Sequence, residues 1–215
     1  MRKLLPFLFA FFVVIVLDDT VHGQDSLAIK KDSTPWPLYH AIQARLDSVF
    51  DDDQSSRQHI DAIQKKYGLQ SRQMDSLYEV MGIKDSIDLE KVTAILDKYG
   101  WLGINEIGEK ANTALFIVIQ HADSLVQVTY LPMMRQAVKD GKARPADLAL
   151  LEDRVLCEQG KPQLYGSQVK ALKTGKYTFF PIQDERNVNK RRQTVGLEPL
   201  EVYARYFGID YHLPK

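Results

Sequence analysis

The sequence predicts a mainly α-helical fold, a single helical domain with a small β-hairpin near its C-terminal third. Apolar residues recur at intervals of three and four through most of residues 37–158, as on the buried face of an amphipathic helix. After Gly160 the pattern changes to short segments, the second of which is rich in aromatic and β-branched residues. The composition, 45% hydrophobic and 26% charged, is typical of a globular protein and excludes a chain that is disordered throughout.

The N-terminus has the features of a secretory signal peptide. Two basic residues precede an almost unbroken apolar run from Leu4 to Leu17, which is shorter than the roughly 20 residues of a membrane-spanning helix. The side chains before Gln24 favour cleavage after Gly23, so residues 1–23 are expected to be removed and the mature protein to be periplasmic or secreted. The alternative is an uncleaved N-terminal anchor, which would be the chain's only contact with a membrane.

Residues 24–35 have no apolar period and are expected to form a flexible leader. Residues 36–99 are expected to form four amphipathic helices, because apolar side chains recur at helical spacing in four successive stretches. These positions are Leu38, Ile42, Leu46 and Val49; Ile60, Ile63 and Tyr67; Met74, Leu77, Tyr78 and Met81; and Leu89, Val92, Leu96 and Tyr99.

Residues 100–215 are expected to form the core of the domain and to fold as one unit with residues 36–99. The stretch 105–121 is apolar on nearly all sides, which is typical of a central helix surrounded by others. A helix is expected at 124–138, with a kink or a restart at Pro132.

The C-terminal part begins with a helix expected at 145–158, where Pro145 stands at a favourable first position. The two strands of the hairpin are expected at 163–169 and 177–182, on either side of the turn residues Thr174-Gly175. Two short helices, at about 185–194 and 199–207, are expected to complete the chain.

Charge and cysteine content exclude several functional classes. The chain has 28 Lys and Arg and 28 Asp and Glu, so an overall attraction to nucleic acid has no basis and no nucleic-acid partner is expected. The single cysteine, Cys157, excludes an intramolecular disulfide and a four-cysteine zinc site. The sequence contains no phosphate loop, dinucleotide fingerprint, paired-histidine zinc helix or nucleophile elbow, and no metal or cofactor is expected.

The first candidate site lies at Gln120-His121-Ala122-Asp123, which closes the most apolar helix. Polar groups in such segments are informative, because burying them without a partner is costly. Histidine exchanges protons near neutrality, so His121 could be a general acid or base, with Asp123 or a second carboxylate orienting it. The alternative is a histidine that caps the last carbonyls of the helix.

The second candidate is Glu152-Asp153-Arg154, which lies between apolar pairs of the helix at 145–158. At helical spacing, one of these charged side chains must face the core or its edge. Asp153 is expected to orient His121 or to bind a cation, and Arg154 to hold a substrate anion. The alternative is a structural ion pair that joins two helices.

The third candidate is the polar run 163–168, whose Gln163, Tyr165, Ser167 and Gln168 could orient a polar ligand. Gly166 would allow the backbone to come close to that ligand. The alternative is an edge strand with solvated amides. Arg192, in the basic run 190–192, could hold a phosphate or carboxylate through two hydrogen bonds, or belong to a solvated charged face.

Taken in order, these motifs resemble a bacterial domain family of unknown function over about residues 95–203, so that the preceding helices lie outside the resemblance. It rests on Tyr99-Gly100-Trp101, Ile107-Gly108, Gln120-His121-Ala122-Asp123, Asp153-Arg154, Gly160, Pro162-Gln163, Tyr165-Gly166-Ser167-Gln168, Pro181, Arg191-Arg192 and Val195-Gly196-Leu197. That family usually has Thr where Ser167 stands and Pro where Leu102 stands. The resemblance implies one shared site for these polar groups, and it implies no reaction.

Two functional hypotheses follow. The first is a hydrolase-like acid/base enzyme of the cell envelope, with His121 and Asp153 as catalytic residues and Ser167 as the only nearby nucleophile. The second is a non-catalytic module that binds a polar envelope ligand or a protein partner. In both, the ligand contacts are expected from Gln120, Asp123, Arg154, Gln163, Tyr165, Ser167, Gln168 and Arg192.

Overall fold

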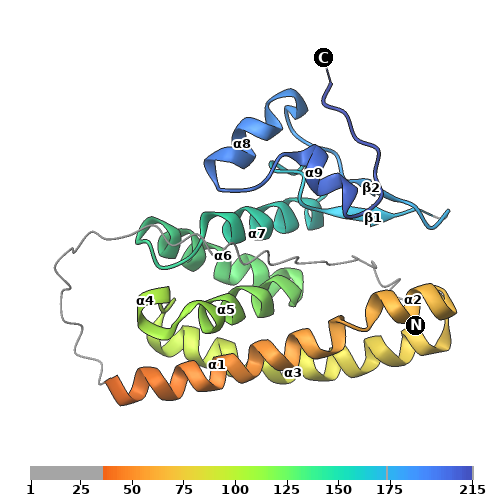
Figure 1. Cartoon of the computed structure of the whole chain (residues 1–215). Helices are drawn as coiled ribbons and strands as arrows, with labels where there is room; N and C mark the ends of the chain where they lie inside the picture. The colour runs from red at the N-terminus through yellow and green to blue at the C-terminus, as the bar shows by residue number, and fades with distance from the viewer. Residues whose placement is uncertain (1–35, 173, 215) are drawn as a thin grey trace.

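The computed structural model describes residues 36–172 and 174–214 (Figure 1). The signal peptide and leader expected at residues 1–35 lie outside the described residues. In chain order the elements are α1 (Trp36–Arg57), α2 (Ile60–Tyr67), α3 (Arg72–Tyr99), α4 (Ile104–Ile107), α5 (Glu109–His121), α6 (Ser124–Lys139), α7 (Pro145–Glu158), β1 (Val169–Ala171), β2 (Tyr177–Phe179), the 3-10 helix η1 (Glu185–Asn187), α8 (Val188–Thr194) and α9 (Leu200–Arg205). The predicted fold class, helical with one small C-terminal hairpin, is confirmed.

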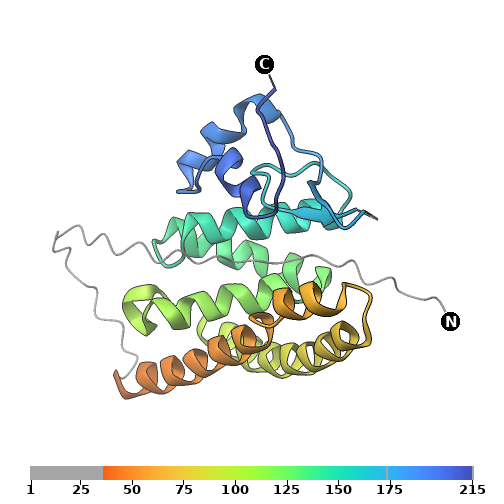
Figure 2. The ribbon, with the colours of Figure 1, turned by 45° about the vertical axis from the view of Figure 1, so that its right-hand side comes forward.

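The helices are stacked in layers around α5. Helices α1 and α3 lie side by side below α5, and α6 and α7 lie on its other side (Figures 1 and 2). The hairpin, α8 and α9 cover the face of α7 that points away from α5. None of the described helices is both long enough and apolar enough to cross a membrane.

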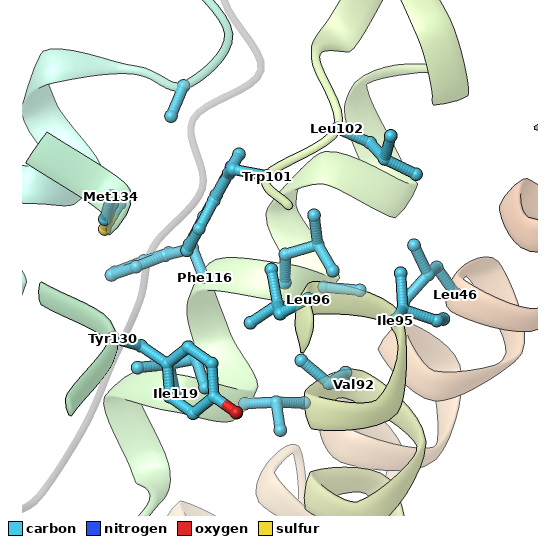
Figure 3. Packing of buried hydrophobic residues seen from close by; sticks show 14 of the residues in the cluster. Leu46, Val92, Ile95, Leu96, Trp101, Leu102, Phe116, Ile119, Tyr130 and Met134 are labelled. Carbon is cyan, nitrogen blue, oxygen red and sulfur yellow. The ribbon is translucent and has the colours of Figure 1, made fainter. Parts of the chain in front are cut away.

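Helix α5 is the centre of the core, as its apolar sequence predicts. Every residue from Ala111 to Gln120 is buried. Phe116 packs among residues from several layers, including Trp101 and Met134, and Leu96 of α3 lies close by (Figure 3). Because burying one such side chain stabilises a fold by about 1.5–3 kcal/mol, this cluster holds the surrounding helices to α5.

Two predicted helix boundaries are wrong. Residues 36–99 form three helices and not four, because α3 continues through Gly82 to Tyr99. One glycine inside a helix costs only about 1 kcal/mol, which the packing of α3 against the core exceeds. The helix expected at 105–121 is divided into α4 and α5 at Gly108, whose φ of 79° is a conformation that other residues rarely adopt.

The remaining helices follow the prediction closely. Helix α6 continues through Pro132 without a restart, and α7 begins at Pro145 and ends at Glu158. The last two expected helices correspond to η1 with α8 and to α9.

The hairpin is shorter than expected. β1 and β2 pair antiparallel in the register Val169–Phe179, Lys170–Thr178 and Ala171–Tyr177. Residues 163–168, expected to extend the first strand, instead form a loop whose backbone is bonded to the segment after β2 at its end, where Phe180 N–H donates to the Gln168 carbonyl at 3.2 Å, and at its start. There Gln163 N–H donates to the carbonyl of Pro181 at 2.9 Å. The backbone groups of this 163–168 loop between its two ends therefore need other partners.

Candidate functional site

Asp153 organises the backbone of the 163–168 loop. It is fully buried on α7, and its Oδ1 accepts hydrogen bonds from the N–H groups of Leu164 (2.6 Å) and Tyr165 (3.0 Å). Its Oδ2 accepts from the N–H of Ser167 at 2.9 Å. Burial raises the pKa of Asp153, and the N–H groups of the loop oppose that rise. The carboxylate thus replaces the neighbouring strand that these N–H groups lack.

Two arginines bind the carbonyl groups of the same loop. Arg191 Nε donates to the Leu164 carbonyl at 2.7 Å, and Arg192 Nη1 donates to the Tyr165 carbonyl at 2.8 Å. Arg192 is 1% exposed, and its guanidinium lies 5.0 Å from the ring centroid of Tyr203. Burial lowers the pKa of Arg192. The guanidinium of Arg192 thus lies inside the fold and binds backbone carbonyls, which corrects the alternative of a solvated charged face.

The side-chain amides predicted to bind a ligand also hold the loop. Gln163 Nε2 donates to the carbonyls of Gln168 and Phe180, each at 3.0 Å, and its Oε1 accepts from Gln168 N–H at 2.8 Å. Gln168 Nε2 donates to Ser167 Oγ at 3.0 Å. Gln163, Ser167 and Gln168 are all buried, which corrects the alternative of an edge strand with solvated amides.

Gly166 is required by the packing of the loop. Its φ is 71°, and a Cβ placed on it would lie 2.9 Å from Leu200 Cδ1 and 3.1 Å from Ile182 Cδ1. The space above this glycine is therefore filled by apolar side chains, whereas the sequence predicted a ligand there.

Tyr165 differs from the other polar residues of the loop, because its side chain is not fully buried. Its backbone is held by Asp153 and Arg192, while its ring is half-buried. Burial, together with the charges of Glu152 and Asp153, raises the pKa of its phenol. The residues that the sequence predicted to bind a ligand therefore hold the 163–168 loop in its conformation.

Two neighbours of Asp153 on α7 are also largely shielded from water. Arg154 Nε lies 3.7 Å from Glu158 Oε1, and burial lowers the pKa of the guanidinium to about 10. Cys157 is a half-buried free thiol, and burial raises its pKa to about 12. A thiol with so high a pKa is a poor nucleophile at neutral pH.

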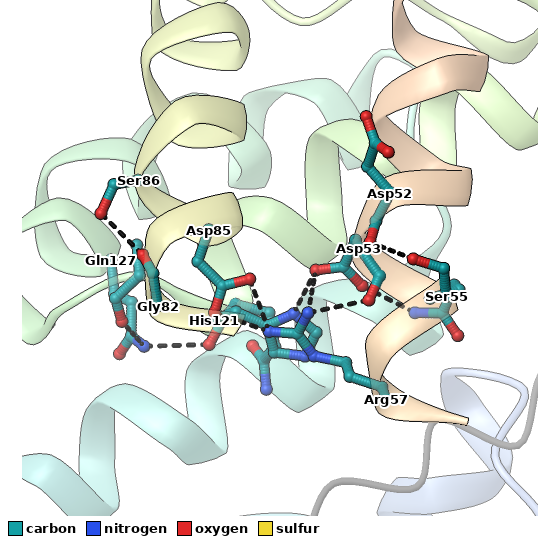
Figure 4. A network of polar contacts seen from close by, with 12 residues as sticks. Asp52, Asp53, Ser55, Arg57, Gly82, Asp85, Ser86, His121 and Gln127 are labelled. Atoms are coloured by element: carbon teal, nitrogen blue, oxygen red, sulfur yellow. Dashed lines mark hydrogen bonds and ion pairs between the residues drawn. The ribbon is translucent and has the colours of Figure 1, made fainter. Parts of the chain in front are cut away.

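His121 belongs to a different network, which it forms with Asp53, Arg57 and Asp85 (Figure 4). Its Nδ1 lies 2.9 Å from Oδ1 of Asp53, a residue of α1 that is 2% exposed. Arg57 Nη1 lies 2.7 Å from the same oxygen, and its Nη2 donates to Asp85 of α3 at 2.9 Å. This Asp53–His121 network therefore joins α1, α3 and α5.

The charges around Asp53 keep it ionised. Burial alone would raise its pKa, but His121 and Arg57 outweigh burial, so that the pKa of Asp53 is lowered. An ionised carboxylate can only accept hydrogen bonds, and the hydrogen of the shared bond therefore resides on His121 Nδ1. The expected partnership of His121 with Asp153 is corrected, because no hydrogen bond joins these two among the described residues, and each is bound elsewhere.

The other residues of the 120–123 motif connect α5 to α6. Asp123 caps α6 by accepting a hydrogen bond from Val126 N–H at 3.0 Å. Gln127 Nε2 donates to the carbonyls of Gln120 (3.1 Å) and Ala122 (2.8 Å). Gln120 is fully buried, and its side-chain amide has no hydrogen-bond partner among the described residues.

A pocket of about 270 Å³ lies against the Asp53–His121 network. It is lined by Asp53, Gly82, Asp85, Ser86, Leu89, Val118, His121, Ala122 and Asp123. A second pocket, of about 480 Å³, is lined by Ser86, Leu89, Glu90, Thr93, Asp97, Leu125, Val126, Thr129 and Tyr130. Because Ser86 and Leu89 line both, the two pockets adjoin, and we call them together the α3–α6 groove.

A large apolar side chain is exposed in this groove. Leu125, in its α6 wall, is 75% exposed. Ile83 and Ile87 of α3 are 60% and 50% exposed, but they line neither pocket and lie on the side of α3 beyond Glu90. Tyr130 O–H donates to Asp97 at 2.7 Å, which links the two walls.

Sequence reasoning missed Asp53, Arg57 and Asp85. A signal for Asp53 is present, because it continues the apolar stripe of Leu46 and Val49 at a spacing of four and is itself buried. The same test finds Asp88, which is 2% exposed within the stripe of α3. Among the described residues, no group of three or more metal-ligating side chains is found.

Comparison of the chain with models of known protein families identifies its family. A model for a family of unknown function, DUF6624, matches residues 40–214. The chain belongs to DUF6624. The match covers the N-terminal helices as well, so α1 and α3, which carry Asp53 and Asp85, are part of the DUF6624 domain and not outside it as the resemblance suggested. No curated protein and no solved structure matches the chain.

We predict that Asp153→Asn destabilises the protein by about 3 kcal/mol, because an amide has one acceptor oxygen and its NH2 would face backbone N–H donors. Urea unfolding measures this loss. Glu79→Gln, an exposed change on α3, is the control and should stay within about 0.5 kcal/mol of the wild type. A fully stable Asp153→Asn protein would contradict the structural role of Asp153.

We predict that Asp53 contributes to the pH dependence of stability. Its folded-state pKa is lowered, so its contribution is present above the ordinary value of 3.8 and is lost as the pH falls through the lower, folded-state value. Asp53→Asn should therefore lower the free energy of unfolding at pH 7 and flatten its decline below about pH 4. Unfolding measured from pH 7 to pH 2.5 tests this, with the 94% exposed Asp210, changed to Asn, as control. An unchanged acid slope in Asp53→Asn would contradict it.

Proposed function

We propose that this DUF6624 protein is an extracytoplasmic bacterial binding module whose protein partner docks in the α3–α6 groove. The observation that carries the proposal is the pair of adjoining pockets whose lining includes Leu89, Val126 and the 75% exposed Leu125. Contiguous exposed apolar side chains rimmed by polar groups are typical of protein-interaction surfaces. The signal-peptide features of residues 1–23 support an extracytoplasmic location.

The hydrogen bonds of the other polar residues favour the groove over the 163–168 loop as the binding site. The side chains of Asp153, Gln163 and Arg192 are occupied by the backbone of the loop. Using them for a ligand would leave buried donors and acceptors without partners, at about 1–3 kcal/mol each. The groove is reached without breaking any of these bonds.

The bond between His121 and Asp53 favours a second candidate, an acid/base enzyme of the cell envelope. A buried carboxylate that holds one imidazole nitrogen is the arrangement that orients a histidine for proton transfer. Asp53, and not Asp153, would then orient His121 in the smaller pocket. Ser86 is the hydroxyl that lines this pocket, and its Oγ donates to the Gly82 carbonyl at 2.8 Å.

The test is site-specific photo-crosslinking in the native bacterium. A benzophenone amino acid at position 90 or 125 should give a discrete adduct, because both side chains line the larger pocket and are exposed. The same label at Asp210, far along the chain and 94% exposed, is the control and should give none. Absence of an adduct at both groove positions, or the same adduct at position 210, would contradict the proposal.

The adduct also distinguishes the two candidates. A partner of unchanged mass supports a binding module. A partner that is cleaved by the wild-type protein, and intact when His121→Ala is introduced into a protein that still folds, supports the acid/base enzyme.

A further inference from the structure

We infer that the occupant of the α3–α6 groove is a basic amphipathic helix of the partner protein. This inference rests on the binding function proposed above and names its partner class.

The charge of the groove favours a basic partner. The larger pocket is lined by Glu90 and Asp97, and the smaller by Asp53, Asp85 and Asp123. His121 is the single lining residue in either pocket that can carry a positive charge. Arg57 compensates Asp53 and Asp85, and Tyr130 binds Asp97, whereas Glu90 is exposed at the side of the groove. Lysine or arginine side chains would complement this surplus of carboxylates.

The apolar residues require a partner with an apolar face. Leu89 and Val126 are half-buried in the lining, and Leu125 is largely exposed. A partner that covers these side chains would gain about 25 cal/mol for each Å² of apolar surface removed from water. The occupant must therefore be apolar on one side and basic at its edges.

The dimensions favour a helix as the shape of that partner. The lining residues of α3 run from Gly82 to Asp97, a length of about 22 Å at 1.5 Å per residue, which equals about four turns of a helix. Both walls are helices whose backbone groups are already bonded within the helix, so an added strand would find no backbone partners there. An amphipathic helix needs only side-chain contacts.

Two other occupants fit less well. An anionic membrane surface would be repelled by the carboxylates of the groove. A second copy of the chain would place the same acidic groove against itself in a two-fold dimer, since such an interface uses one surface twice. Both are outcomes of the experiment below.

The experiment is a binding titration of the whole secreted protein with designed peptides of 16 residues, followed by fluorescence anisotropy. We expect a peptide with leucine on one helical face and lysine at its edges to bind at least tenfold more tightly than its glutamate counterpart. The same composition in scrambled order should also lose at least tenfold, because it has no apolar face. Raising the ionic strength should weaken binding of the lysine peptide, since the edge charges are exposed to solvent.

Variants inside and outside the groove test whether the lysine peptide binds there. Glu90→Lys and Leu125→Asp should each weaken binding of the lysine peptide by about tenfold. Asp210→Lys and Leu172→Asp are exposed changes outside the groove and should leave binding unchanged. All four positions are exposed, so the variants are expected to fold normally, which circular dichroism checks.

The outcomes separate this inference from the proposed function. Equal binding of the lysine, glutamate and scrambled peptides would overturn the inference, and so would binding that Glu90→Lys and Leu125→Asp leave intact. No peptide binding, combined with groove-specific crosslinks, would overturn the inference and retain the proposed function. Loss of both would overturn both. Concentration-dependent dimerisation that Leu125→Asp abolishes would assign the groove to a second copy of the chain and overturn the inference. Binding of the protein to anionic vesicles that Leu125→Asp abolishes would assign the groove to a membrane surface and also overturn it.

Discussion

The burial of α5 from Ala111 to Gln120 is the constraint on which the rest of the structure depends. A helix segment with no exposed side must be surrounded, and α1, α3, α6 and α7 surround it. Its polar end must then be bonded inside the protein, because a buried imidazole without a partner is costly. Asp53 supplies that partner, with Arg57 and Asp85 completing the network. The same arrangement separates α3 from α6 beside His121, where the groove lies.

A second consequence concerns the 163–168 loop, which has no strand beside it for most of its length. Asp153 binds its N–H groups, and Arg191 and Arg192 bind its carbonyls, so side chains perform the role that a β-ladder performs elsewhere. A run of amides and hydroxyls in a sequence therefore has two physical meanings. It either binds a ligand or replaces missing backbone partners, and in this protein the second meaning accounts for Gln163, Ser167 and Gln168.

The pattern of neighbouring residues in the sequence predicted most of the fold. It predicted less of the site, because the site depends on contacts between residues that are far apart in the chain. Helical spacing predicted the central α5, and Pro145 marked the start of α7, because these features depend on neighbours in sequence. The partner of His121 is 68 positions away on α1, and no spacing rule identifies it. What the sequence does contain is Asp53 in the apolar stripe after Val49, which indicates a buried carboxylate but not which group it binds.

The polar residues form two independent sets, one around Asp53 and one around Asp153. Double-mutant cycles on the free energy of unfolding test this independence, by combining His121→Ala with Asp53→Asn and, separately, with Asp153→Asn. We expect a coupling of roughly 1–3 kcal/mol for His121 with Asp53, and additivity within about 0.5 kcal/mol for His121 with Asp153. Strong coupling of His121 to Asp153, with none to Asp53, would contradict this independence.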